Sequence, residues 1–253
     1  KYLIQSAFDG YNVCIFAYGQ TGSGKTHTIY GDDANPGLTP RAIEEVMRCV
    51  YEGGDKGKFS VKMEAYMLEL YQEQINDLLL PPSKMKAPPK LDIKKDAKGW
   101  VTVTNSTVVP VGSKEDIMNV IDAGLSVRKT TSTKMNVESS RSHLIFSLII
   151  ETTDLQTQQV TRGKLSFVDL AGSERVKKTG TSGELKAESM FINRSLSYLE
   201  QVVVALGKAK PNPNPNPNPN PNQVVVALGK AKPGKAGHTP YRQSKLTHLL
   251  KVN

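Results

Sequence analysis

The sequence predicts an α/β layered fold, because apolar runs typical of buried strands alternate along the chain with stretches of helical periodicity. A glycine-rich turn directly after the first of these runs, Asn12–Tyr18, supports the same fold class. The length of 253 residues, with 38% hydrophobic and 23% charged residues, suits an ordinary soluble globular protein that needs no disulfide bonds.

A helix is expected next, from Thr39-Pro40 to Val50, because proline suits the first turn of a helix. Apolar residues recur there at helical spacing, namely at Ile43, Val46, Met47 and Val50. Phe59–Tyr71 alternates in hydrophobicity and predicts a strand. Pro81–Pro89 contains four prolines and no periodicity, so it predicts a surface loop.

The middle of the chain predicts two short strands or a hairpin over Trp100–Val111, which is rich in Val and Thr. Ser113 followed by Asp116 resembles a capping box and predicts a helix that ends near Gly124. The β-rich runs His143–Thr152 and Val160–Leu170 predict a long hairpin. Glu184–Leu206 predicts a long amphipathic helix.

One segment does not resemble a globular sequence. Residues 211–222 are Pro-Asn repeated six times, and the ten residues 201–210 recur unchanged as residues 223–232. A slipped repeat or an artefact explains this block more readily than a function. If it is genuine, the spacer is expected to be an exposed flexible loop.

Charge is concentrated at one end of the chain. The last 53 residues hold eight basic residues and no Asp or Glu, so they carry +8 of the net charge of +9. Such a region predicts an acidic polymer as partner, although a solubilising tail has the same composition.

Cys14 and Cys49 are too far apart for a disulfide scaffold and favour a reducing compartment. No stretch approaches the roughly 20 apolar residues of a membrane span.

A nucleotide site is predicted by Gly19–Thr26, which matches G-x-x-x-x-G-K-[ST] at every fixed position and follows the predicted strand. Glycines let backbone N–H groups turn toward phosphate oxygens, and the next helix points its N-terminus at the same anion. Lys25 would neutralise the β- and γ-phosphates, and Thr26 would bind Mg²⁺.

Two further segments could sense the γ-phosphate. Asp169-Leu-Ala-Gly172 ends an apolar run, so Asp169 could lie near the metal and Gly172 could offer its N–H to a phosphate oxygen. Asn136–His143 (NVESSRSH) adds hydroxyls suited to Mg²⁺ and to positioning water. Taken singly, the first is also typical of a turn and the second of a serine-rich loop.

Together the three segments resemble the kinesin motor domain. The P-loop is Gly19–Thr26, the first switch is matched by Asn136–His143, and the second switch, D-L-A-G-S-E, by Asp169–Glu174. The resemblance covers nearly the whole chain apart from the Pro-Asn block. It implies a P-loop NTPase-type fold in which helices cover both faces of a mixed central sheet with a mostly parallel core.

The resemblance implies hydrolysis of ATP with Mg²⁺. Ser139 would place the attacking water, Ser140 would complete the metal shell, and Asp169 would hold the metal's waters. Gly172 would contact the γ-phosphate. Arg141 and Glu174 would form an ion pair that closes the site, with Glu174 in the proton path. The residues expected to contact nucleotide are Gly19, Gln20, Thr21, Gly22, Ser23, Gly24, Lys25, Thr26 and His27.

The resemblance also implies that the acidic partner is the microtubule. The expected binding face combines the helix Glu184–Leu206 with basic and polar residues at Lys177, Lys178, Lys235, His238, Tyr241, Arg242 and Lys245. The sequence is most similar to the C-terminal-motor, minus-end class, in particular to the calmodulin-binding kinesins of plants and algae. Calmodulin would therefore bind regions outside this chain. The expected location is the cytoplasm, on the microtubule cytoskeleton.

The resemblance further predicts one partial motor domain over residues 1–253, because strands before the P-loop and the family's final strand and helix have no counterpart. Central strands would then lie at sheet edges. Two functions stay open: a microtubule-dependent motor ATPase, and a non-motile structural microtubule-binding protein or inactive fragment. A P-loop NTPase acting on nucleic acid is disfavoured by the first-switch match.

Overall fold

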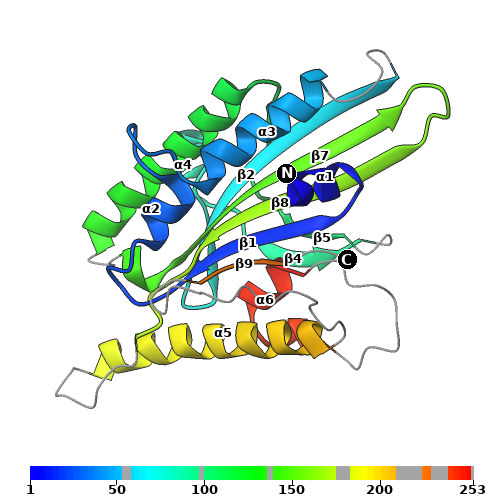
Figure 1. The fold of residues 1–253 in the computed structure, drawn as a ribbon. Coiled ribbons are helices and arrows are strands. Elements are labelled where there is room, and N and C mark those ends of the chain that lie inside the picture. The colour runs from blue at the N-terminus through cyan, green and yellow to red at the C-terminus, as the bar shows by residue number, and fades with distance from the viewer. Residues whose placement is uncertain are drawn as a thin grey trace.

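The computed structural model describes residues 1–52, 58–96, 100–135, 139–174, 183–208, 224–228 and 239–251. Its main feature is a mixed sheet between two layers of helices, as the sequence predicts (Figure 1). Six strands follow one another across this sheet in the order β3 (Gln74–Asp77), β2 (Phe59–Tyr71), β7 (His143–Asp154), β8 (Val160–Asp169), β1 (Asn12–Tyr18) and β9 (Val224–Leu228). A seventh strand, β6 (Val109–Val111), pairs with β2, and β4 (Asp92–Lys95) forms a separate ribbon with β5 (Val101–Thr104).

Parallel pairing is more restricted than predicted. Among the described strands only β1 and β8 run parallel, while β2, β7 and β8 form a continuous antiparallel set. The cause is the long β7–β8 hairpin, which the sequence predicts correctly: consecutive strands joined by a short turn must pair antiparallel.

The two helical layers pack on opposite faces of the sheet (Figure 1). One layer contains α1 (Tyr2–Phe8), α2 (Lys25–Tyr30), α3 (Leu38–Glu52) and α4 (Lys114–Met135). The other contains α5 (Gly183–Lys208) and α6 (Lys245–Leu249), with the β4–β5 ribbon beside them. Short 3₁₀ turns complete the described elements: η1 (Pro82–Lys84), η2 (Ser139–Arg141) and η3 (Tyr241–Gln243).

Side-chain alternation in the strands divides the core into these two layers. On β1, Val13, Ile15 and Ala17 face the α1–α4 side, whereas Cys14 and Phe16 face α5 and α6. Both faces of the strand are therefore apolar, which explains why its sequence is a continuous hydrophobic run.

The predictions for β1, α3, β2 and α5 are confirmed to within a few residues. The prediction that α4 ends near Gly124 is wrong, because the helix continues to Met135. Gly124 lies against the Met67 side chain, which a Cβ at that position would overlap. The glycine therefore permits close packing of helix on sheet instead of ending the helix. Ser113 does cap its start, accepting a hydrogen bond from the Asp116 N–H at 3.0 Å.

The segment Trp100–Val111 forms two strands, as one of the two alternatives predicts, but they do not pair with each other. β5 pairs with β4, and β6 pairs with β2. Asn105, with φ +64°, turns the chain out of β5.

The expected exposure of central strands is not observed at β1. Its second edge pairs antiparallel with β9, from Cys14–Leu228 to Tyr18–Val224. β9 belongs to the second copy of the repeated ten residues, whereas the first copy lies largely in the C-terminal turns of α5. The same ten-residue sequence thus contributes to a helix and to a strand. Its Val-rich run is compatible with either conformation, and tertiary contacts determine which one forms. The Pro-Asn spacer lies outside the described residues.

Within the described part of the chain, no helix is long and apolar enough to cross a bilayer. Cys14 and Cys49 are both free thiols, consistent with the absence of a disulfide scaffold.

We predict that Gly163→Ala destabilises the fold. Gly163 on β8 lies so close to α1 that a Cβ would overlap the Ala7 carbonyl oxygen. Because backbone on both sides must then shift, the free energy of unfolding should fall by about 1–3 kcal/mol in urea titrations. Gly112→Ala is the control, since its Cβ would meet only Asp116 Oδ2, at 3.8 Å. Equal losses in the two variants would contradict the packing of α1 on β8.

Candidate active site

The P-loop lies between the end of β1 and the start of α2. Gly22 and Gly24 have φ values of +78° and +83°, in the left-handed region that glycine adopts without strain. Gln20 provides the carbonyl that closes the loop, accepting hydrogen bonds from Ser23 N at 3.2 Å and from Lys25 Nζ at 2.9 Å. Burial lowers the pKa of Lys25, an effect that Asp169 and Glu174 partly oppose by favouring the charged form.

The second switch contacts the P-loop at two points. Thr26 Oγ1 donates to Asp169 Oδ2 at 2.6 Å, which joins the predicted metal-binding hydroxyl to the predicted metal-facing carboxylate. Glu174 accepts from Thr21 N at 2.9 Å and from Thr21 Oγ1 at 2.5 Å. Burial alone would raise the pKa of Glu174, but these hydrogen bonds hold it below its usual range.

The two switches also contact each other through the backbone. Gly172 N–H, the predicted phosphate donor, donates to the Ser140 carbonyl oxygen at 2.7 Å. Ser139 and Ser140 lie in η2, directly before β7. The predicted contact of Gly172 N–H with a phosphate oxygen would require this hydrogen bond to exchange.

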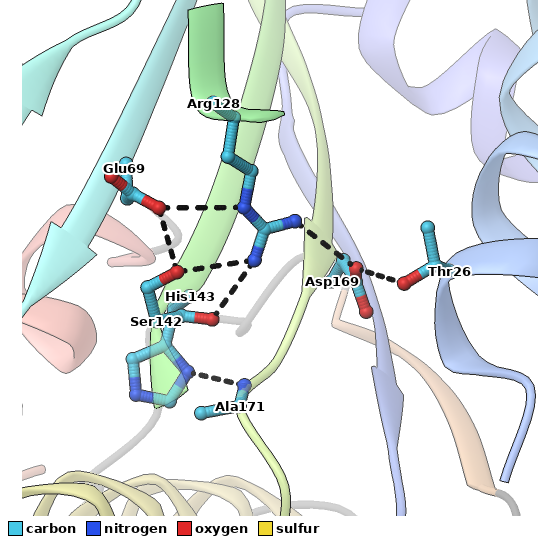
Figure 2. A network of polar contacts seen from close by, with 7 residues as sticks. All are labelled: Thr26, Glu69, Arg128, Ser142, His143, Asp169 and Ala171. Carbon is cyan, nitrogen blue, oxygen red and sulfur yellow. Dashed lines mark hydrogen bonds and ion pairs between the residues drawn. The ribbon is translucent and has the colours of Figure 1, made fainter. Parts of the chain in front are cut away.

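A buried arginine that the sequence analysis missed organises both switches (Figure 2). Arg128 of α4 lies with Nε 3.4 Å from Glu69 Oε1 and Nη1 3.5 Å from Asp169 Oδ2. Its Nη2 donates to Ser142 O and Oγ, both at 3.2 Å, and Ser142 Oγ donates to Glu69 Oε1 at 2.7 Å. Because two carboxylates and a carbonyl surround one guanidinium, its charge is compensated out of contact with water.

A signal for Arg128 was present in the sequence. It continues the buried stripe of Ile117, Ile121 and Gly124, at spacings of three or four residues. A charged residue on the apolar stripe of a helix indicates a buried partner. The signal was missed because the helix was expected to end at Gly124.

The predicted ion pair between Arg141 and Glu174 is replaced by a different one. In the described part of the chain, Arg141 Nη1 donates to Glu188 Oε2 at 2.9 Å, while Glu174 bonds to Thr21 as described above. Glu188 lies on α5 and also accepts from the Tyr71 hydroxyl at 2.8 Å. The Arg141 side chain therefore ties the first switch to the long helix, whereas the backbone of the first switch bonds to the second switch.

His143, at the start of β7, is a buried and neutral imidazole. Ala171 N donates to its Nδ1 at 3.0 Å, and its Nε2 lies 2.8 Å from Ser195 Oγ on α5. Burial, with a smaller contribution from the Arg128 charge, lowers the pKa of His143 to about 3. Its proton must occupy Nε2, because Nδ1 accepts a backbone N–H.

The residues present fit a hydrated Mg²⁺ ion beside a nucleotide. Asp169 Oδ1 and Ser23 Oγ are buried without a hydrogen-bond partner in the described part of the chain. Hard oxygen atoms are the ligands that Mg²⁺ prefers, usually with several retained waters. Among the described residues, no group of three or more His, Cys, Asp and Glu side chains suited to a metal occurs.

Some predicted site residues lie elsewhere or outside the described residues. The His27 imidazole contacts Asp32 at 3.2 Å, beyond the C-terminal end of α2. Of the predicted microtubule face, Tyr241, Arg242 and Lys245 lie in η3 and at the start of α6, which pack beside α5. The residues Asn136, Lys177, Lys178, Lys235 and His238 lie outside the described residues, and nothing is described of the Ser139 side chain.

The profile of the kinesin motor domain family matches residues 1–253. With a P-loop and two mutually bonded switch segments on this α/β fold, the chain belongs to the kinesin motor domain family.

Similar proteins agree with this assignment. The chain is 54% identical over 250 residues to kinesin-like protein KIN-14I of Oryza sativa subsp. japonica and 51% identical over 250 residues to kinesin-like protein KIN-14E of Arabidopsis thaliana. Each alignment covers 99% of this chain and 18% of the relative, so the chain spans less than a fifth of these relatives' length.

Solved structures agree in fold. A C-terminal motor and motor homology domain of Kar3Vik1 fused to a synthetic coiled coil superposes with a TM-score of 0.76 at 34% identity, covering 98% of this chain and 56% of that one. A fast kinesin gives the same TM-score and identity, with 98% and 62% coverage. The predicted similarity to the C-terminal-motor class is confirmed.

We predict that Arg128→Ala is strongly destabilising, because it leaves Glu69 and Asp169 buried without their shared cation. The expected loss in unfolding free energy is about 3–5 kcal/mol, measured by urea titration. Lys114→Ala is the control, since the Lys114–Glu44 pair is about half exposed and should contribute little. A loss for Arg128→Ala no larger than that of the control would contradict the bridging role.

We predict that the His143 ring stays neutral well below the usual histidine range. A lowered pKa means that the unfolded state binds the proton first, so this group stabilises the fold above about pH 6.5 and loses that effect toward about pH 3. Ring ¹⁵N NMR of the folded protein should show the Nε2–H tautomer from pH 8 to pH 5. A titration midpoint near 6.5 would contradict the buried geometry.

Proposed function

We propose that this chain is the ATP-hydrolysing, microtubule-binding motor unit of a longer protein. The observation that carries the proposal is the convergence of three sequence-distant segments by direct hydrogen bonds. Thr26 bonds to Asp169, Thr21 bonds to Glu174, and Gly172 bonds to Ser140. A structural protein would not need the P-loop bonded to the second phosphate-sensing segment and that segment bonded to the first.

In the proposed reaction the P-loop binds the phosphates of ATP. Backbone N–H groups at Gly22–Thr26 surround the phosphate oxygens, and Lys25 leaves the Gln20 carbonyl to neutralise the β- and γ-phosphates. Thr26 and Ser140 would hold Mg²⁺, with Asp169 bonding to its waters. When bound, Mg²⁺ supplies positive charge that offsets the charge developing on the transferred phosphoryl group.

The switch residues complete the site. Ser139 orients the attacking water, and Gly172 donates its N–H to a γ-phosphate oxygen after releasing Ser140. Glu174 accepts the proton of that water through the solvent. Phosphoryl transfer needs positioning and charge neutralisation more than covalent chemistry, so these contacts account for most of the expected rate.

The proposed microtubule face is α5 together with η3 and α6. Arg242 is exposed there, next to the helix. The surplus of +8 in the last 53 residues suits an acidic polymer and should make binding sensitive to salt. Calmodulin, as a partner of regions beyond this chain, stays a prediction from resemblance.

We predict that Lys25→Ala reduces ATP hydrolysis by at least about 100-fold, because no other described cation lies in the P-loop to balance the phosphates. Phosphate release with MgATP measures the effect. Lys62→Ala, which removes an exposed lysine on β2, is the control and should leave turnover unchanged. Normal hydrolysis by Lys25→Ala would refute the site assignment.

We predict that Glu174→Ala still binds ATP but hydrolyses it about 100- to 10,000-fold more slowly, as expected for loss of a proton-accepting group. Binding of a fluorescent ATP analogue and single-turnover hydrolysis separate the two effects. Thr21→Ser is the control, because it keeps the hydroxyl that contacts Glu174. Wild-type hydrolysis by Glu174→Ala would remove this residue from the mechanism.

A further inference from the structure

A buried chain of hydrogen bonds connects the second switch to the long helix. Ala171 N donates to His143 Nδ1 at 3.0 Å, His143 Nε2 contacts Ser195 Oγ at 2.8 Å, and Ser195 Oγ donates to the Ile192 carbonyl at 2.8 Å. His143 and Ser195 are each only 4% exposed. The chain therefore runs from a switch peptide to the α5 backbone without contact with water.

The donor and the acceptor of each hydrogen bond in this series are fixed by chemistry. A backbone N–H can only donate, so Nδ1 of His143 accepts and the neutral ring carries its hydrogen on Nε2. Nε2–H then donates to Ser195, whose own hydrogen goes to the Ile192 carbonyl. Because each group is satisfied in one arrangement only, the chain cannot relax by reversing its hydrogen bonds.

A second contact reaches the same face of α5. Arg141 pairs with Glu188, which precedes Ser195 by seven residues, or about two helical turns. The Arg141 side chain is 30% exposed, so water can replace Glu188 as its partner. Water has no such access at His143. The two contacts thus differ: water can replace the partner in the Arg141–Glu188 ion pair, whereas it cannot reach the His143–Ser195 hydrogen bond.

We propose that His143 and Ser195 are positioning residues that transmit movement of the second switch to α5. The inference rests on the proposed function. Ala171 directly precedes Gly172, whose N–H must exchange the Ser140 carbonyl for a phosphate oxygen when nucleotide binds.

Movement of the 171–172 peptide, which carries the Gly172 N–H, also displaces the adjoining 170–171 peptide, which carries the Ala171 N–H, and this has two outcomes at His143. It either breaks the buried hydrogen bond from Ala171 or carries the imidazole, and with it Ser195, along. Breaking the bond leaves a buried polar group unsatisfied, which is costly. Transmission to α5 is therefore the favoured outcome, and α5 belongs to the proposed microtubule face.

The test is the nucleotide dependence of microtubule affinity in the full-length protein. Dissociation constants are measured by co-sedimentation with ADP and with a non-hydrolysable ATP analogue. Their ratio in the wild type should be about 5 to 150, the usual range of coupling between sites. Ser195→Ala should bring the ratio closer to one by a factor of about 3 to 10, with nucleotide affinity unchanged in the absence of microtubules.

Two variants separate coupling from simple loss of stability. Ser166→Ala removes a buried serine–serine hydrogen bond to Ser147 that also measures 2.8 Å, at a residue that is also 4% exposed. That bond joins β7 to β8 and does not reach α5, so the ratio should stay at the wild-type value. Ser195→Thr keeps the hydroxyl and should restore the ratio.

A wild-type ratio in Ser195→Ala would overturn the inference, as would an equal loss in Ser166→Ala. If the wild type itself binds microtubules equally well with both nucleotides, the inference falls together with the proposed function. That outcome is distinguishable, because it appears before any substitution is made.

Discussion

The site depends on one buried guanidinium. Arg128 reaches from α4 through the core to Glu69, Ser142 and Asp169, which belong to three different strand ends or switch segments. A buried charge is tolerated only when its partners are held in place, so the fold must keep α4, β2, β7 and β8 in register. That requirement links the stability of the sheet to the geometry of the P-loop, since Asp169 also accepts the hydrogen bond from Thr26.

The two faces of the sheet on either side of Arg128 support different parts of the site. The α1–α4 side supports the P-loop and Arg128, while the α5 side receives two contacts from the first switch, Arg141 with Glu188 and His143 with Ser195. A change in the phosphate contacts therefore has a short physical route to the helix proposed to meet the microtubule. The route consists of the Arg141–Glu188 ion pair, which can exchange with water, and the buried, neutral His143 imidazole, whose hydrogen bonds cannot.

The local sequence was sufficient to predict the structure where one residue pattern is compatible with only one conformation. The buried run of β1 and the glycines of the P-loop are examples, because few other conformations satisfy those residues. The local sequence was insufficient where tertiary contacts determine the end of an element or the partner of a side chain. Gly124 lies inside α4 because Met67 packs against it, and Arg141 pairs with Glu188 because α5 brings that carboxylate close. The repeated ten residues show the limit most clearly, since their two copies form part of α5 and β9.

In the proposed function, ATP hydrolysis at the P-loop site is coupled to microtubule binding at the polymer-binding face. Phosphate release from MgATP, measured with and without microtubules at low ionic strength, tests it most directly. We expect microtubules to accelerate phosphate release strongly and added salt to weaken this acceleration, because the basic surface must approach an acidic polymer. A folded protein that binds microtubules but releases phosphate at the same rate with and without them would contradict this coupling and would favour a structural microtubule-binding role.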